Sequence, residues 1–181
     1  MGMKLSFELS DSDLRYFRKA LKQSREAVRD AEEQEIIDAI RHALDEIRSN
    51  EPLPDFVARR IPALELLVQM LTDDEWQLPT NERERLLTMF VYFSDPEDIL
   101  PDEIPVIGYL DDVIIMELIM RELQHVRDAY DDFRHFREDF DKQHGKSIDG
   151  AIRRDRLDRR RQQLHQRMLR RSKRNKKAAI W

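Results

Sequence analysis

The run Val113-Ile114-Ile115-Met116-Glu117-Leu118-Ile119-Met120 lies near the middle of this chain of 181 residues, and its side chains are apolar except for Glu117. A helix formed by this run is apolar on nearly every side, which is typical of a helix surrounded by other helices. The run is too short and too charged to cross a bilayer. The chain also has only 4 glycines and 7 prolines, few for the turns of an all-β fold. We therefore predict an all-α fold, a compact bundle of about five or six helices.

Downstream of this run, the apolar pattern narrows to a helical stripe that includes Val126, Tyr130 and Phe133. We predict one long helix from about residue 109 to about residue 140. Residues 143–150 contain two glycines and predict a linker. The segment 151–181 follows, and its thin apolar stripe predicts a basic helical extension. The apolar positions of that stripe are Ile152, Leu157, Leu164 and Met168.

The charge of the chain is distributed unevenly between its two parts. Residues 151–181 hold 13 Lys and Arg residues against Asp155 and Asp158, a charge of +11, which leaves −16 for residues 1–150. We therefore divide the chain into an acidic helical domain (1–142), a linker (143–150) and a basic helix or tail (151–181). Such an asymmetry bears on the partners of a protein rather than on its fold.

Upstream of the central run, shorter patterns predict further elements. Alternating apolar residues at Leu5, Phe7 and Leu9 predict a short strand, and spacings of three and four predict helices over 14–28, 36–47 and 57–71. Pro62 must bend the last of these helices or lie in its first turn. The sequence Thr72-Asp73-Asp74-Glu75 fits a capping box and predicts a short helix that carries Trp76.

Composition excludes several classes of chemistry. The chain has no cysteine, which excludes disulfides, thiolate nucleophiles and cysteine-based zinc sites. Glu8 interrupts the N-terminal segment before any apolar run, so the segment does not resemble a signal peptide. We expect a cytoplasmic protein. The four glycines are scattered and cannot form a phosphate-binding loop.

The most distinctive motif lies directly before the central run. Two prolines and a glycine fix an unusual backbone path there, and four carboxylates lie on or beside it. The motif consists of Asp98, Pro101, Asp102, Pro105, Gly108, Asp111 and Asp112.

At these seven positions the chain resembles the YkvA-like family (DUF1232), a bacterial family of unknown function with the hallmark D-L-I-P-D-x-I-P-x-x-G-x-x-D-D. The resemblance covers about residues 94–120. Glu103 departs from the pattern, which has an apolar residue there. The resemblance implies a compact helical domain and implies no enzymatic activity.

The four aspartates of the motif have two interpretations. In the structural one, Asp111 or Asp112 caps the following helix, Asp98 lies in the first turn of a short helix, and Asp102 accepts hydrogen bonds from turn amides. In the alternative, the four carboxylates converge on a divalent cation and the protein is a metal-dependent hydrolase. We favour the structural interpretation and predict no cofactor, with the divalent cation as the alternative.

A second pattern, Glu122-x-x-His125, has the spacing of a half-site in di-iron helical bundles. Asp132-x-x-His135 repeats it ten residues later on the same predicted helix. Ten residues rotate a helix by about 1000°, so the two pairs point in different directions. We interpret both as exposed pairs without a metal.

The basic segment is the strongest candidate for a binding element. Its arginines and lysines can neutralise phosphates, which predicts salt-sensitive binding to RNA or DNA. The alternatives are an anionic membrane surface, an intramolecular or dimer contact with the acidic domain, and a solvated tail without a partner. The acids offered for the contact are, for instance, Asp128, Asp131, Asp132, Glu138 and Asp139. We favour nucleic acid and predict a non-enzymatic binding or adaptor protein. The candidate residues are Arg153, Arg154, Arg159, Arg160, Arg161, Arg170, Arg171, Lys173, Arg174, Lys176 and Lys177.

Overall fold

The computed structural model describes residues 31–49, 54–94, 110–145 and 148–175, together with isolated positions between Glu8 and Val28. These residues form seven helices, α2 to α8, and contain no strand. The all-α prediction is confirmed. Leu5, Phe7 and Leu9, on which the predicted strand rests, lie outside the described residues, as does the motif segment 95–109.

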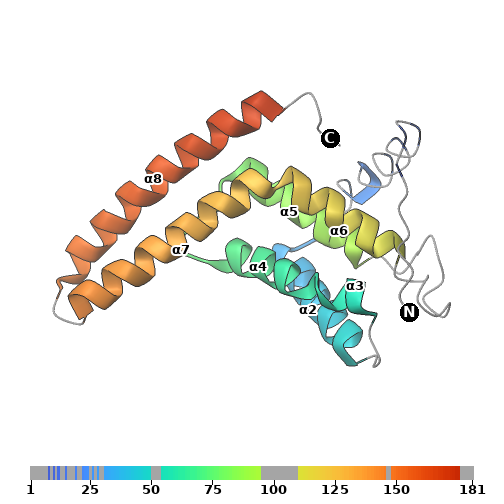
Figure 1. The fold of residues 1–181 in the computed structure, drawn as a ribbon, viewed down its shortest axis with the longest axis horizontal. Helices are drawn as coiled ribbons and strands as arrows, with labels where there is room; N and C mark the ends of the chain where they lie inside the picture. The colour runs from blue at the N-terminus through green and yellow to red at the C-terminus, as the bar shows by residue number, and fades with distance from the viewer. Residues whose placement is uncertain are drawn as a thin grey trace.

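The first four of these helices form the body of the fold (Figure 1). They are α2 (Glu33–Ser49), α3 (Asp55–Ala58), α4 (Ile61–Thr72) and α5 (Thr80–Phe93). Pro62 lies in the first turn of α4, where its missing N–H has no intrahelical acceptor to lose. Arg83 of α5 forms an ion pair with Glu33 of α2 and donates a hydrogen bond of 2.9 Å to the carbonyl of Leu71 in α4. One side chain thus links three helices.

The long helix predicted over 109–140 is divided in two, which corrects that prediction. α6 (Leu110–Glu122) and α7 (Gln124–His144) are separated by Leu123. Leu123 is fully buried, and its carbonyl accepts the amides of Val126 and Arg127 at 2.9 Å, so it begins the new helix. No glycine or proline marks this break. The residue at the break is buried in the core, and the periodicity of the apolar residues does not predict a break there.

The basic segment forms α8 (Gly150–Asn175), which runs antiparallel to α7 and lies against it (Figure 1). Asp149 caps α8 by accepting the amide of Ala151 at 2.6 Å. Leu157, Leu164 and Met168 are at most 2% exposed and belong to the main hydrophobic cluster. The helical extension is therefore part of the core. Ile152 was assigned to the same stripe and is instead 54% exposed.

The central apolar run, residues 113–120, was predicted to be too short and too charged to cross a bilayer. Among the described residues, no helix combines the length and apolar character that a bilayer crossing needs.

A pair of leucines in α8 tests whether this helix is part of the core. Leu164→Ala should lower the free energy of unfolding by about 2–5 kcal/mol, because it removes a buried side chain and leaves a cavity. Leu169, 43% exposed on the same helix, is the matched control, and Leu169→Ala should change stability by at most about 0.5 kcal/mol. Urea denaturation of both variants measures the difference. Equal and small effects would show that α8 is not packed as described.

Candidate functional site

The loop between α4 and α5 positions the polar site of the protein. Asp73 accepts the backbone amides of Glu75 and Trp76 at 3.0 Å each, and Thr72 is the last residue of α4. The predicted capping box is therefore wrong: Asp73 makes the cap-like contacts, and residues 74–76 form a turn rather than a helix. An aspartate side chain commonly accepts the backbone amide two residues further along the chain in such a turn. Gln77 ends the turn with a φ of 50°, in the left-handed region.

This turn inserts Trp76 between α7 and α8. Trp76 has no exposed surface, and its ring lies 5.5 Å from Tyr130 and 5.3 Å from Phe133, both on α7. From α8, His165 contacts the same indole edge-on at 4.4 Å. These are ordinary distances for attractive aromatic pairs. Trp76 therefore joins the body to both helices of the α7–α8 hairpin.

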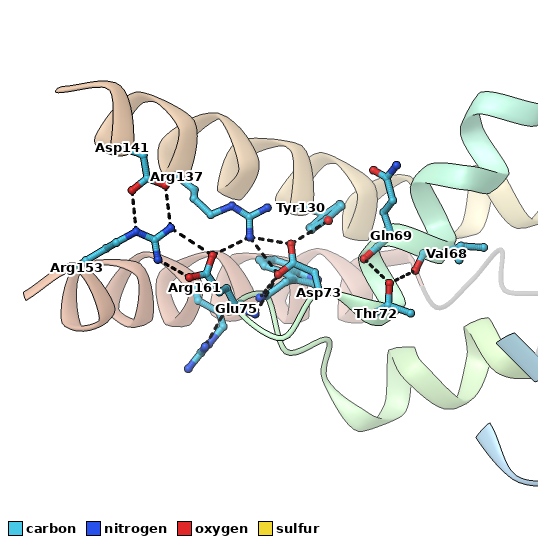
Figure 2. Close-up of polar contacts among 11 residues, drawn as sticks. Val68, Gln69, Thr72, Asp73, Glu75, Tyr130, Arg137, Asp141, Arg153 and Arg161 are labelled. Atoms are coloured by element: carbon cyan, nitrogen blue, oxygen red, sulfur yellow. Dashed lines mark hydrogen bonds and ion pairs between the residues drawn. The ribbon is translucent and has the colours of Figure 1, made fainter. Parts of the chain in front are cut away.

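Around Trp76, a network of charged side chains holds α7 to the loop (Figure 2). The Tyr130 hydroxyl donates to Asp73 at 3.0 Å, and Arg137 contacts Asp73 at 2.9 Å and Glu75 at 3.0 Å. Burial and the neighbouring Asp73 carboxylate raise the pKa of Tyr130. Burial alone would lower the pKa of Arg137, but Asp73 and Glu75 outweigh it and the pKa is raised. Both side chains keep their protons at neutral pH.

The N-terminal half of α8 joins the same network (Figure 2). Arg153 contacts Asp141 of α7 through Nε at 2.7 Å and also forms an ion pair with Glu75 of the loop. Its hydrogen bonds lower the pKa of Asp141. Arg161, further along α8, donates to the carbonyl of Glu75 at 3.0 Å. Two of the arginines predicted to bind a polyanion are thus used inside the fold.

Three more arginines along α8 contact α7. Arg160 lies over the ring of Phe136 at 5.5 Å, in cation–π geometry. Arg167 forms an ion pair with Asp132, and Arg171 forms one with Asp128 at 3.4 Å. The side chains of the last pair are each 50% exposed. This is the contact with the acidic domain that one of the alternatives predicted.

Several arginines of α8 face solvent. Arg154, Arg156 and Arg170 are exposed, and no ion pair involves them within the described part of the chain. Arg159 is exposed and pairs with Asp155 on its own helix at 3.0 Å. The remaining candidate lysines and arginines, from residue 173 onwards, have side chains outside the described set.

Arg156 and Arg167 were not among the residues predicted from the sequence, because neither has a basic residue directly beside it. On a helix, residues three, four and seven apart share a face. That spacing, applied to the sequence, identifies one row along α8, which we call the arginine stripe. It consists of Arg156, Arg160, Arg167, Arg170 and Arg174.

The motif aspartates are only partly within the described residues. Asp98 and Asp102 lie outside them, as do Pro101, Pro105 and Gly108. Asp111 and Asp112 fall in the first turn of α6, and their side chains are not among those described. The structural turn and the metal site therefore both stay predictions. Among the described residues, no group of three or more His, Asp or Glu side chains is placed to hold a metal ion.

The Glu122-x-x-His125 pattern requires a correction. His125 is 7% exposed, so the interpretation as an exposed pair is wrong at this position. Burial lowers the pKa of His125, although the nearby Glu82 carboxylate opposes the shift. His135, in the second pattern, is exposed as expected and contacts the carbonyl of Asp131 at 2.7 Å.

Comparison with known proteins gives one result. Residues 85–118, which include the end of α5, the motif and most of α6, match the family DUF1232, described as proteins of unknown function. The match confirms the resemblance inferred from the motif and covers about a fifth of the chain. No curated protein and no solved structure matches the chain.

The buried His165 predicts a pH dependence of stability. Burial, with Arg161 nearby, lowers the pKa of His165 to about 4. Between about pH 6.5 and pH 4 the unfolded chain binds a proton that the folded protein does not, so the free energy of unfolding should fall as pH falls through this window. The slope from one such group is at most about 1.4 kcal/mol per pH unit. Chemical denaturation at several pH values measures it.

His165→Gln is the matched variant, because it keeps a polar side chain of similar length without a titrating ring. Its stability should change less between pH 6.5 and pH 4 than that of the wild type. A pH profile identical to that of the wild type would contradict the assignment.

Proposed function

We propose that this protein is a non-enzymatic binding protein that contacts nucleic acid through the arginine stripe of α8. The observation that carries the proposal is the exposure of Arg156 and Arg170, which lie on this stripe and have no ion pair within the described part of the chain. Arginine donates several hydrogen bonds in a planar fork that fits phosphate oxygens. The ligand is thus a polyanion with phosphates along its length.

The spacing of the stripe fits such a ligand. Arg156 and Arg170 are fourteen residues apart, which is about 21 Å along a helix. That distance corresponds to the axial rise of about six base pairs. A straight helix of this length can follow one nucleic-acid backbone over several phosphates.

The rigid support of α8 favours binding as well. Leu157, Leu164 and Met168 are buried in the main hydrophobic cluster, and Arg153 fixes the N-terminal half of the helix. A helix that is already ordered loses little conformational entropy when it binds. The stripe is therefore presented by the fold rather than by a segment that must first order itself.

The packing of α8 favours nucleic acid over a membrane surface. A helix that lies in a membrane interface needs an apolar face for the lipid. The apolar stripe of α8 is turned into the core, and its solvent side carries Gln162, Gln163 and Gln166. Isolated exposed residues such as Leu169 do not make an apolar face.

The test uses substitutions rather than deletion of 151–181, because deletion would remove buried core residues. The double variant Arg156→Gln/Arg170→Gln should bind labelled single-stranded RNA and duplex DNA more weakly than the wild type. The slope of log affinity against log salt should be smaller by about 1.4 for the single strand and about 1.8 for the duplex, as two phosphate contacts are lost. Fluorescence anisotropy at several salt concentrations measures both.

Arg41→Gln/Arg59→Gln is the charge-matched control. Arg41 is on α2 and Arg59 follows α3, and both side chains are exposed. The helices α2 and α3 lie apart from α8 in Figure 1. This variant should keep the wild-type slope. Binding that is absent or independent of salt in the wild type would reject the proposal, and so would equal slopes in the wild type and the stripe variant.

A further inference from the structure

The polar contacts that attach the two halves of α8 to the fold differ in their exposure to solvent. In the N-terminal half, Arg153 contacts two carboxylates and Arg161 is 14% exposed, with its guanidinium on the Glu75 carbonyl. In the C-terminal half the ion pairs with α7 are solvent-accessible: Arg167 and Asp132 are 41% and 46% exposed, and Arg171 and Asp128 are each 50% exposed. Beside the buried Leu164 and Met168, the polar contacts of this half are thus ion pairs that compete with water and salt.

Asp132 and Asp128 occupy the groups that a phosphate would use. A carboxylate and a phosphate both accept charge-assisted hydrogen bonds from a guanidinium. Arg167 belongs to the arginine stripe, and Arg171 directly follows Arg170 of the stripe. An incoming phosphate can therefore reach these arginines only by replacing the aspartates of α7 or by sharing the guanidinium with them.

We propose that Asp128 and Asp132 of α7 are internal competitors that occupy Arg171 and Arg167 and so limit the affinity of α8 for nucleic acid. This inference rests on the proposed function and concerns its regulation. Replacing the aspartates by phosphates costs little free energy, because exposed ion pairs of this kind contribute little to stability. Breaking them leaves both aspartates and both arginines accessible to water, so no unpaired charge is buried.

The competition changes which surface the ligand meets. While the pairs are intact, Arg156 and Arg170 are the exposed arginines of the stripe without an ion pair among its described side chains, and the carboxylates of Asp128 and Asp132 lie on the neighbouring α7. When phosphates replace the aspartates, Arg167 and Arg171 join them and the basic surface becomes continuous. A ligand with several adjacent phosphates gains from this exchange, whereas an isolated phosphate must displace an aspartate for a single contact.

The test removes the competitors without removing an arginine. Asp128→Asn/Asp132→Asn should bind a labelled single-stranded RNA or a DNA duplex of about 20 nucleotides or base pairs more tightly than the wild type, by roughly 2- to 30-fold, which is the fold-change that loss of two exposed ion pairs allows. The measurement is made at about 150 mM salt, where charges further apart than about 8 Å are largely screened. Circular dichroism checks that the helix content is unchanged.

The charge-matched control is Asp131→Asn/Asp139→Asn. Asp131 pairs with Arg134 of its own helix, and within the described residues no ion pair joins Asp131 or Asp139 to α8. This variant changes the net charge by the same amount on the same helix, and its affinity should stay within about 2-fold of the wild type. Equal tightening by both double variants would overturn the inference, because it would show a general charge effect.

The remaining outcomes separate this inference from the proposed function. If the wild type binds with the predicted salt slope and Asp128→Asn/Asp132→Asn binds no more tightly, the competition is wrong and the proposed function stands. If neither the wild type nor any variant binds RNA or DNA, the proposed function is wrong and the competition falls with it. Tightening by Asp128→Asn/Asp132→Asn alone supports both.

Discussion

The rest of the structure depends on the burial of Trp76 between α7 and α8. The indole has no exposed surface and contacts both helices, through Phe133 on one and His165 on the other. Burying a large aromatic side chain contributes several kcal/mol, more than any single ion pair around it. The turn at Asp73 positions the Trp76 side chain between α7 and α8. The short loop between α4 and α5 thus packs the four-helix body against the hairpin.

The charged residues around Trp76 explain how a chain with an acidic part and a basic part folds as one unit. Arg153 bridges Asp141 and Glu75, and Arg137 bridges Glu75 and Asp73, so positive and negative groups alternate across three elements (Figure 2). In such a network each side chain is already ordered by its other partners. The separation into an acidic domain and a basic tail, read from sequence, thus describes two sides of one interface.

The sequence allowed the all-α class to be predicted because the apolar spacings are long and regular. The apolar spacing did not predict the break at Leu123, where one helix ends and another begins without a glycine or a proline. The sequence also predicted a capping box begun by Thr72, whereas Asp73, the second residue of that sequence, accepts the backbone amides. The helical spacing of Leu157 and Leu164 predicted a basic helical extension, but one separate from the acidic domain rather than buried in its core. The apolar stripe of α8 is narrow, and only its packing against α7 shows that it can hold the helix in the core. The arginine stripe was not predicted because its members are three to seven residues apart in the sequence and share one face only when the segment is helical.

The central claim of this account is that α8 is an integral part of the fold and presents its arginines from a fixed position. Native-state hydrogen exchange measures this most directly. We predict that the amides of residues 157–168 in α8 exchange with the same free energy of opening as those of residues 126–133 in α7, because Trp76 and the core join the two helices in one cooperative unit. Free energies of opening near zero in α8, beside full protection in α7, would contradict the account.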